Sequence, residues 1–133
     1  MIRILCENEL KKDKEYKWKI RILQTKKYDI NIGVAPMDFN FNLSDPFKNG
    51  WYYYCNNGQL YSGPPHNYFG KEVNLKKKKD EIIIIMDMNK RSLKFIIGDE
   101  DKDASYNDIP IDKPIVPAIT LYNKNDSVEI IGC

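Results

Sequence analysis

Apolar and polar residues alternate at every second position along much of this chain, and this pattern limits the possible folds more than any other feature. In residues 17–22, Trp18, Ile20 and Ile22 alternate with basic residues, which predicts a strand with one face in the core and one in solvent. Residues 28–34 repeat the pattern. No segment of a dozen residues shows the 3.6-residue period of an amphipathic helix. The chain is therefore predicted to be all-β.

Further strands are expected wherever the alternation returns. The short link at residues 24–27 predicts that 17–22 and 28–34 pair as a hairpin. Residues 82–88 are apolar at both alternations, which predicts a central strand covered on both faces. The other expected strands lie at 93–97, 115–122, 128–131 and, with a weaker pattern, 105–111.

The segment 51–61 holds the clearest turn signal of the sequence. Asn57-Gly58 lies between two β-rich runs and suits a two-residue type I′ turn, because both central positions require positive φ. Such a turn would pair Cys55 with Leu60 and Tyr54 with Tyr61. We expect one face of the hairpin to enter the core and the other to be rich in tyrosine. The core set is Trp51, Tyr53, Cys55 and Leu60, and the tyrosine set is Tyr52, Tyr54 and Tyr61.

Length and composition are those of a single globular domain spanning residues 1–133. A chain of 133 residues with 42% hydrophobic residues can bury one core without help from metals or disulfides. Glycine and proline fall mostly between the expected strands. Many short strands separated by turns predict an antiparallel two-sheet β-sandwich or a barrel.

The cysteines and the single histidine argue against a metal site. Cys6, Cys55 and Cys133 show no metal-binding spacing, so we expect three reduced thiols and a cytoplasmic or nuclear location. His66 has no nucleophile motif near it and is expected to be a solvent-exposed loop residue. We therefore expect no metal, no cofactor and no catalytic residue.

The charge balance argues against nucleic-acid and membrane binding. Lysine and arginine number 21 against 19 acidic residues, without the basic excess of a nucleic-acid binder. Residues 76–79 are four lysines that could touch RNA or anionic lipid, but we expect a solvated face there. The acidic residues at 99–103 are expected to form a solvated loop. The longest apolar run, 82–86, is too short to cross a bilayer, and no secretory leader is expected.

Several motifs occur in the order found in SPRY domains. The sequence Ile115-Val116-Pro117-Ala118-Ile119 is similar to the Tyr-Pro-Ala-Val block of that family, and Ser92-Leu93-Lys94-Phe95 is similar to its Thr-Leu-x-Phe element. The other segments that resemble the family lie at 15–20, 31–35, 49–53, 57–61 and 81–87. Together they cover most of the chain, so the chain resembles a SPRY core without the PRY extension.

The resemblance implies a bent, antiparallel two-sheet β-sandwich of the concanavalin-like jelly-roll type. It also implies a non-catalytic protein-interaction module that binds a peptide or protein surface through loops at one end. Members of the family occur in ubiquitin-ligase adaptors, tripartite-motif proteins, methyltransferase subunits and calcium channels. An adaptor or scaffold role, as a domain of a longer protein, is what this resemblance implies.

The expected binding site combines two loops. Counting alternate strand directions places the connections 7–15, 36–50 and 62–80 at one end, and the turn at 122–126 joins them if 105–111 is a strand. The resemblance implies that the loop after Gly-Val-Ala and the turn after the Pro-Ala block contact the ligand. The predicted partner-binding residues are Met37, Asp38, Phe39, Asn40, Phe41, Tyr122, Asn123 and Lys124.

Alternatives remain for these residues and for the function. Phe39 and Phe41 either anchor a partner or fold back onto the core, and Tyr122 either faces the partner or ends a core strand. A carbohydrate-binding, lectin-like sandwich is the second hypothesis, because tyrosine and tryptophan rings beside asparagine and aspartate suit a sugar. An enzyme fragment is the third. We expect a monomer whose partner is a protein or peptide, without nucleic acid or membrane.

Overall fold

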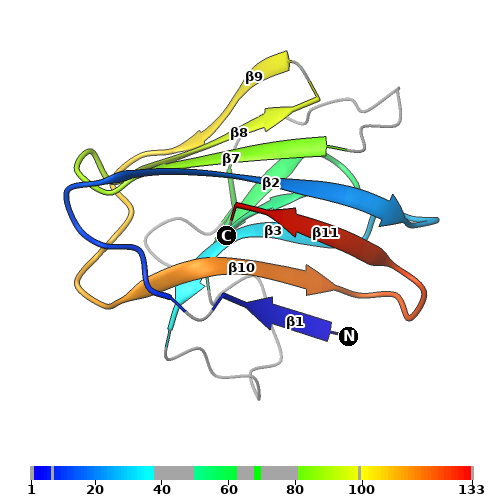
Figure 1. Ribbon diagram of the computed structural model, residues 1–133. Helices are drawn as coiled ribbons and strands as arrows, with labels where there is room; N and C mark the ends of the chain where they lie inside the picture. Colours follow the sequence, from blue (N-terminus) through cyan, green and yellow to red (C-terminus); the bar gives the residue numbers. More distant parts are fainter. Residues whose placement is uncertain are drawn as a thin grey trace.

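The regular structure of this protein consists of β-strands. The computed structural model describes residues 2–6, 8–37, 50–62, 68–69, 81–98 and 100–132, and within these residues it contains eleven strands and no helix. The strands form two antiparallel sheets that pack face to face (Figure 1). The predicted all-β, two-sheet architecture is confirmed.

The first sheet has six strands in the order β1-β10-β3-β4-β5-β6. Its strands are β1 (Ile2–Leu5), β10 (Ile115–Leu121), β3 (Ile30–Pro36), β4 (Trp51–Tyr54), β5 (Gln59–Ser62) and β6 (Tyr68–Phe69). The second sheet has five strands in the order β11-β2-β7-β8-β9. Its strands are β11 (Ser127–Ile131), β2 (Glu15–Gln24), β7 (Glu81–Asp87), β8 (Ser92–Ile97) and β9 (Glu100–Tyr106).

The core lies between the two sheets and is built from alternate residues of their strands. In the second sheet, β7 and β8 bury every second side chain, such as Ile84 and Phe95. In the first sheet, Ile32 and Tyr53 are fully buried on the facing side. The rings of Tyr53 and Phe95 meet across the sandwich with their centroids 5.5 Å apart. Each such aliphatic or aromatic side chain contributes about 1.5–3 kcal/mol by leaving water.

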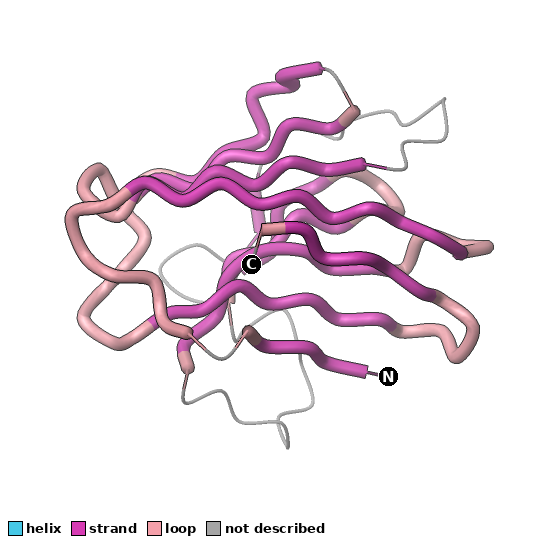
Figure 2. The backbone as a smooth tube through the Cα atoms, in the orientation of Figure 1, coloured by secondary structure: helices cyan, strands magenta, loops and turns pink. Residues whose placement is uncertain are grey.

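The prediction that the first two expected strands, 17–22 and 28–34, pair as a hairpin is wrong. β2 belongs to the second sheet and β3 to the first, so the link at 25–29 crosses from one sheet to the other (Figure 2). The crossing bends sharply at Tyr28, whose φ of 56° is rare for a side chain of this size. Alternation in sequence predicts which side of a strand is buried, but it does not say in which sheet the strand lies.

The β4–β5 hairpin follows the predicted faces with a different register. Tyr53 pairs with Leu60 and Tyr52 with Tyr61, so four residues, 55–58, form the turn instead of two. Gly58 adopts a φ of 74° and its N–H donates to the Tyr54 carbonyl at 2.8 Å. The shift is two residues along one strand, which leaves every side chain on its expected face. The predicted core set, including Cys55 and Leu60, is therefore buried as expected.

Two further expectations for the second sheet need correction. β7 is central, as predicted, but its outward residues Ile83 and Ile85 are only half-buried, so it is not covered equally on both faces. The acidic segment expected as a loop at 99–103 contributes residues 100–103 to the edge strand β9. Because β9 pairs with β8 through a register shift, its weak alternation gave little sign of a strand.

Candidate functional site

Met37, where the first predicted loop begins, and Tyr122, where the second begins, lie at opposite ends of the sandwich. β3 and β10 pair antiparallel, with Pro36 opposite Ile115 and Ile30 opposite Leu121. The N–H of Met37 accordingly donates to the Pro114 carbonyl at one end, whereas residue 122 follows the other end of β10. Seven residues of β-strand separate the ends by roughly 20 Å. The prediction that both loops share one end is wrong.

The short strand β6 explains this error. The sequence predicted a single connection over 62–80, but within it Tyr68–Phe69 forms a strand antiparallel to β5. The chain therefore crosses the sandwich once more before β7, and every later strand runs opposite to the predicted direction. Met37 is exposed, and the predicted residues Asp38, Phe39, Asn40 and Phe41 lie outside the described residues.

The end that carries Tyr122 gathers three segments, which we call the tyrosine end: residues 25–29, 55–58 and 122–126. Asp29 connects two of them and the adjoining strand β4. Its Oδ1 accepts the hydroxyl proton of Tyr54 at 2.6 Å, and its Oδ2 lies 3.3 Å from Nδ2 of Asn123. The N–H of Tyr122 donates to the Asp29 carbonyl at 3.2 Å. The β10–β11 turn is thus fastened to the start of β3.

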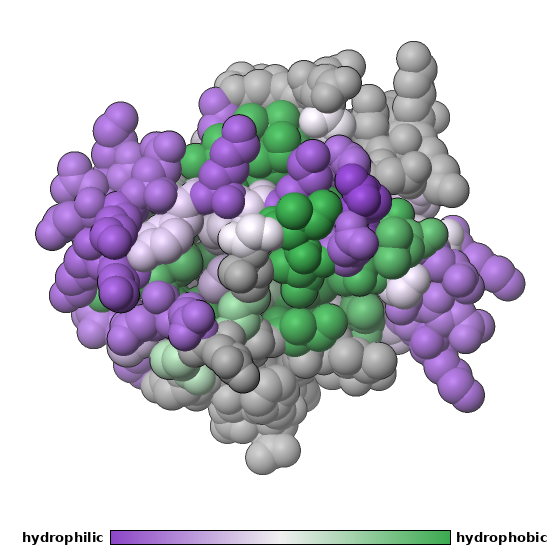
Figure 3. All heavy atoms as spheres, in the orientation of Figure 1, coloured by the Kyte–Doolittle hydropathy of each residue, from purple (hydrophilic) through white to green (hydrophobic). Residues whose placement is uncertain are grey.

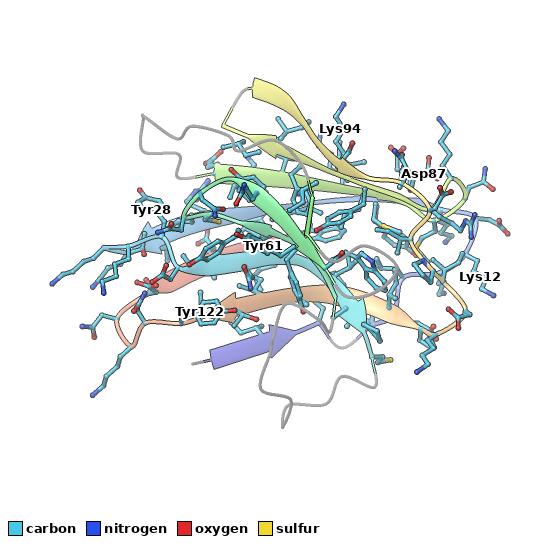
Figure 4. All side chains as sticks on the ribbon, turned by 180° about the vertical axis from the view of Figure 1, so that it is seen from behind. Lys12, Tyr28, Tyr61, Asp87, Lys94 and Tyr122 are labelled. Carbon is cyan, nitrogen blue, oxygen red and sulfur yellow. The ribbon has the colours of Figure 1, made fainter. Side chains whose placement is uncertain are left out.

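Next to this end, tyrosine rings line the outward side of the first sheet. Tyr54 and Tyr61 meet edge to face with their centroids 5.7 Å apart. The hydroxyl of Tyr61 lies 3.0 Å from Nδ2 of Asn57 and donates to Oε1 of Gln59 at 3.1 Å. Figure 4 shows Tyr61 and Tyr122 on the same side of the sandwich, away from Lys12 and Asp87 at the opposite end. These rings are half-buried, which leaves part of each ring for a ligand.

A buried polar side chain lies beneath these rings. Asn31 is fully buried on the outward side of β3, between its cross-strand neighbours Tyr54 and Thr120. Its Nδ2 donates to the hydroxyl oxygen of Tyr122 at 2.9 Å, but its Oδ1 has no hydrogen-bond partner. An unmatched buried acceptor costs about 1–3 kcal/mol.

The electrostatics of the site keep Tyr54 a hydrogen-bond donor. Burial raises the pKa of Tyr54 above its ordinary range, and the hydrogen bond to the Asp29 carboxylate and the charge of that carboxylate raise it further. The phenol therefore stays protonated under physiological conditions. Asp29, Asn123 and Tyr122 then offer acceptors and donors side by side at the surface, an arrangement that suits peptide recognition more than chemistry.

Three of the predicted binding residues lie at the tyrosine end. Tyr122, Asn123 and the exposed Lys124 were predicted as binding residues, and all three belong to the tyrosine end. Asp29 and Asn31 were missed. Their signal was present, because both are polar residues within the alternating segment 28–34, where Asn31 turned out to be fully buried.

The reactive side chains expected from the sequence can be compared with the described part of the chain. Among these residues, no three or more His, Cys, Asp or Glu side chains are grouped closely enough to hold a metal ion. Burial raises the pKa of the Cys55 thiol well above its ordinary range, so it is a poor nucleophile. Cys6 is disulfide-bonded, so the expectation of three reduced thiols is wrong.

His66 and residues 76–79 lie outside the described residues. In the described segments, no helix has the length and apolar character needed to span a membrane.

Comparison with solved structures places the fold among SPRY domains. The human HERC1 SPRY domain superposes with a TM-score of 0.79 and 19% sequence identity, over 98% of this chain and 81% of that one. A second human SPRY domain gives a TM-score of 0.71 at 15% identity, over 97% of this chain and 82% of the other. The TRIM65 PSpry domain gives 0.69 at 11%, over 98% and 68% of the two chains.

The family model agrees with these structural likenesses. No curated protein matches the chain in sequence. The SPRY domain model, in contrast, matches residues 15–133, which begin at β2 and include the tyrosine end. The chain therefore belongs to the SPRY domain family, as its motifs had indicated.

Proposed function

We propose that this chain is a non-catalytic module that binds a short peptide or a protein surface at its tyrosine end. SPRY domains are in general protein-interaction modules. The observation that supports this particular surface is the hydrogen-bonded group of Asp29, Tyr54, Asn123 and Tyr122, which comes from three separate segments of the chain. Aromatic rings held by such contacts lose little conformational entropy when a partner binds.

The chemistry of the surface suggests the kind of ligand. Half-buried tyrosine rings favour an apolar or aromatic side chain of the ligand, and Asp29 with Asn123 favours a peptide backbone or an amide. The exposed Lys124 and the exposed lysines 26 and 27 surround this end with positive charge. We therefore propose a ligand that combines an aromatic anchor with flanking acidic residues.

The test begins with peptides selected from a random displayed library against the wild-type chain. Their affinities are then measured by calorimetry for Tyr122→Ala and for Lys12→Ala, a matched change at the opposite end. We expect Tyr122→Ala to weaken binding at least tenfold, about 1.4 kcal/mol, and Lys12→Ala to have no effect. Circular dichroism checks that both variants fold. Selected peptides that bind Tyr122→Ala as tightly as the wild type contradict the proposal.

The predicted binding residues 37–41 remain a separate candidate, of which Met37 lies at the other end of the sandwich. A Met37→Ala, Phe39→Ala, Phe41→Ala variant tests it independently, because it leaves the tyrosine end unchanged. If this variant loses the selected peptides and Tyr122→Ala keeps them, the binding site is the loop. The lectin alternative is tested on a glycan array, where the tyrosine-end proposal expects no sugar to bind.

Several finer proposals rest on the family and on the charge balance. An adaptor or scaffold role, including one in a ubiquitin ligase, a monomeric state and the absence of nucleic-acid binding are consistent with the family and with the charge balance of 21 basic and 19 acidic residues. The proposed cytoplasmic or nuclear location rested partly on reduced thiols, and the disulfide at Cys6 removes that support.

A further inference from the structure

The outward face of the second sheet carries large aliphatic side chains at its centre. Alternate residues of β7 and β8 are buried in the core, so the residues between them point outward. These outward positions include Ile83 and Ile85 of β7 and Ile96 of β8, and all three are half-buried. Ile131 of the edge strand β11 is 40% exposed. An antiparallel sheet with one face in solvent normally places polar residues at such positions.

Cross-strand pairing joins these side chains into one patch, which we call the isoleucine face: Ile83, Ile85, Ile96 and Ile131. Ile83 pairs with Ile96 on one side and with Lys19 on the other, and Lys19 in turn pairs with Ile131. Ile85 is the next outward residue of β7, about 7 Å along the strand. Figure 3 shows hydrophobic side chains grouped over β7 and β8, with hydrophilic side chains beside them.

Two lysines border the isoleucine face on either side of Ile85. Ile85 pairs with Lys17 of β2 and with Lys94 of β8, so the two lysines are two strand spacings apart, roughly 10 Å. Figure 4 shows Lys94 on the second sheet, pointing away from the sandwich. Lys17 is exposed and forms no ion pair within the described part of the chain. The middle of the face is therefore flanked by positive charge.

Acidic side chains lie at the two ends of the face instead. At the end next to Ile83, Glu81 contacts Nζ of Lys19 at 3.2 Å and Nε of Arg21 at 3.1 Å. These hydrogen bonds lower the pKa of the Glu81 carboxyl, which keeps it charged. At the end next to Ile85, Glu15 pairs with Asp87. An anionic membrane laid over the whole face would meet these carboxylates, which disfavours it as the occupant.

A second copy of this chain does not match the face either. Two identical sheet faces meet across a two-fold axis that lies in the plane between them. An axis along β7 would bring Lys17 of one copy against Lys94 of the other. An axis across the strands, between Ile83 and Ile85, would bring Lys17 against Lys19. Both arrangements oppose like charges, so the complementary partner is acidic beside its apolar surface.

We propose that the isoleucine face docks an amphipathic helix of a partner protein, whose apolar stripe is flanked on both sides by acidic side chains. A helix with its side chains is about 10–12 Å wide, which matches the separation of Lys17 from Lys94. A helix lying along β7 sets its stripe on the isoleucines, and its acidic flanks reach the two lysines. Apolar residues three or four apart on a helix are about 5–6 Å from each other, close to the spacings on the sheet. This surface belongs to the second sheet and does not depend on the tyrosine end.

The test uses a displayed library of helical peptides with a fixed leucine stripe, selected against the whole chain. The positions beside the stripe are fixed as glutamate, glutamine or lysine in three sublibraries, and the others are random. The selected peptides are then titrated by calorimetry against Ile85→Lys and against a Lys17→Glu, Lys94→Glu double variant. Met37→Lys is the matched control, because Met37 is also apolar and is 44% exposed but lies away from this face. Circular dichroism checks that each variant folds.

We expect the glutamate sublibrary to be enriched at least tenfold over the lysine one. Ile85→Lys is expected to weaken binding at least tenfold, because it places a charge beneath the apolar stripe, and Met37→Lys to leave it unchanged. The double variant is expected to prefer the same peptides with lysine flanks, a reversal that a loss of folding does not produce.

Three outcomes would overturn the proposal. The first is equal enrichment of the three sublibraries, and the second is an affinity that Ile85→Lys leaves unchanged. The third is occupation of the face by something else. Wild-type dimers in sedimentation that Ile85→Lys dissociates would assign the face to a second copy. Binding to phosphatidylserine vesicles that the double variant abolishes would assign it to a membrane.

Discussion

At the scale of single residues, Gly33 is a position where the first sheet has no room for a side chain. A Cβ built there would overlap the carbonyl oxygen of Trp51 on the neighbouring strand, which is backbone and has no room to move. We expect Gly33→Ala to cost about 3 kcal/mol or more in the free energy of unfolding, measured with urea. Gly132→Ala is the control, because its nearest contact would be 3.6 Å and its cost is limited to the strain of its positive φ, about 1 kcal/mol. Equal losses for the two variants contradict this interpretation.

The sequence predicted well which side chains of a strand face the core, but it did not predict the buried polar side chain of Asn31. Trp18, Ile20 and Ile22 are buried because alternation along a strand allows one side only to face the core. Asn31 breaks this rule, since it is fully buried on the outward side of β3. Its side chain donates a hydrogen bond to Tyr122, which is 91 residues away in the chain, and no local pattern reports such a contact.

At the scale of elements, Tyr106 connects the two sheets. It ends β9 in the second sheet, and its fully buried hydroxyl lies 2.8 Å from the carbonyl oxygens of Tyr52 and Tyr61 in the first. Burial raises the pKa of Tyr106 above its ordinary range, so the hydroxyl keeps its proton, and its single O–H is shared between these two carbonyl oxygens. The end of β9 is thereby tied to β4 and β5.

We expect Tyr106→Phe to destabilise the chain by about 1–3 kcal/mol, because it leaves buried carbonyl oxygens without this donor. Tyr16→Phe is the matched control, since the Tyr16 hydroxyl only accepts the exposed N–H of Lys11. Its loss is expected to stay below about 0.5 kcal/mol in the same urea titration. Similar effects in the two variants would mean that the contact between β9 and the first sheet contributes nothing to stability.

Strand existence was more predictable than strand pairing. The alternating segment 17–22 and the continuous apolar run 82–86 were recognised as strands because several residues contribute to each signal. β6 has two residues and β1 has four, which is too few for a pattern to stand out. The consequence is larger than the element, since missing β6 reversed the predicted direction of all later strands and with it the position of Met37 relative to Tyr122.

At the scale of the whole molecule, both sheets share one core and are expected to unfold together. Trp18 belongs to the second sheet and Trp51 to the first, and both are buried in the same cluster. In Trp18→Phe and in Trp51→Phe, the remaining tryptophan reports on one sheet. We expect its fluorescence and the far-ultraviolet circular dichroism to give coincident urea curves in each variant. A fluorescence midpoint apart from the circular dichroism midpoint would show that the sheets unfold separately.

The SPRY fold was predicted from the order of motifs. A match to a family implies how the strands of its fold are arranged, whereas alternation in sequence only predicts where strands lie. Residues 115–119 and 92–95 resembled SPRY elements, and the match over residues 15–133 bears this out. The disulfide at Cys6 had no such support, since widely spaced cysteines reveal a bond only once the fold brings them together.

The separation of Met37 from Tyr122 gives the domain two poles. The seven paired residues of β3 and β10 lie between the two ends. Because sites this far apart contribute additively, changes at one pole can accumulate while the other keeps its chemistry.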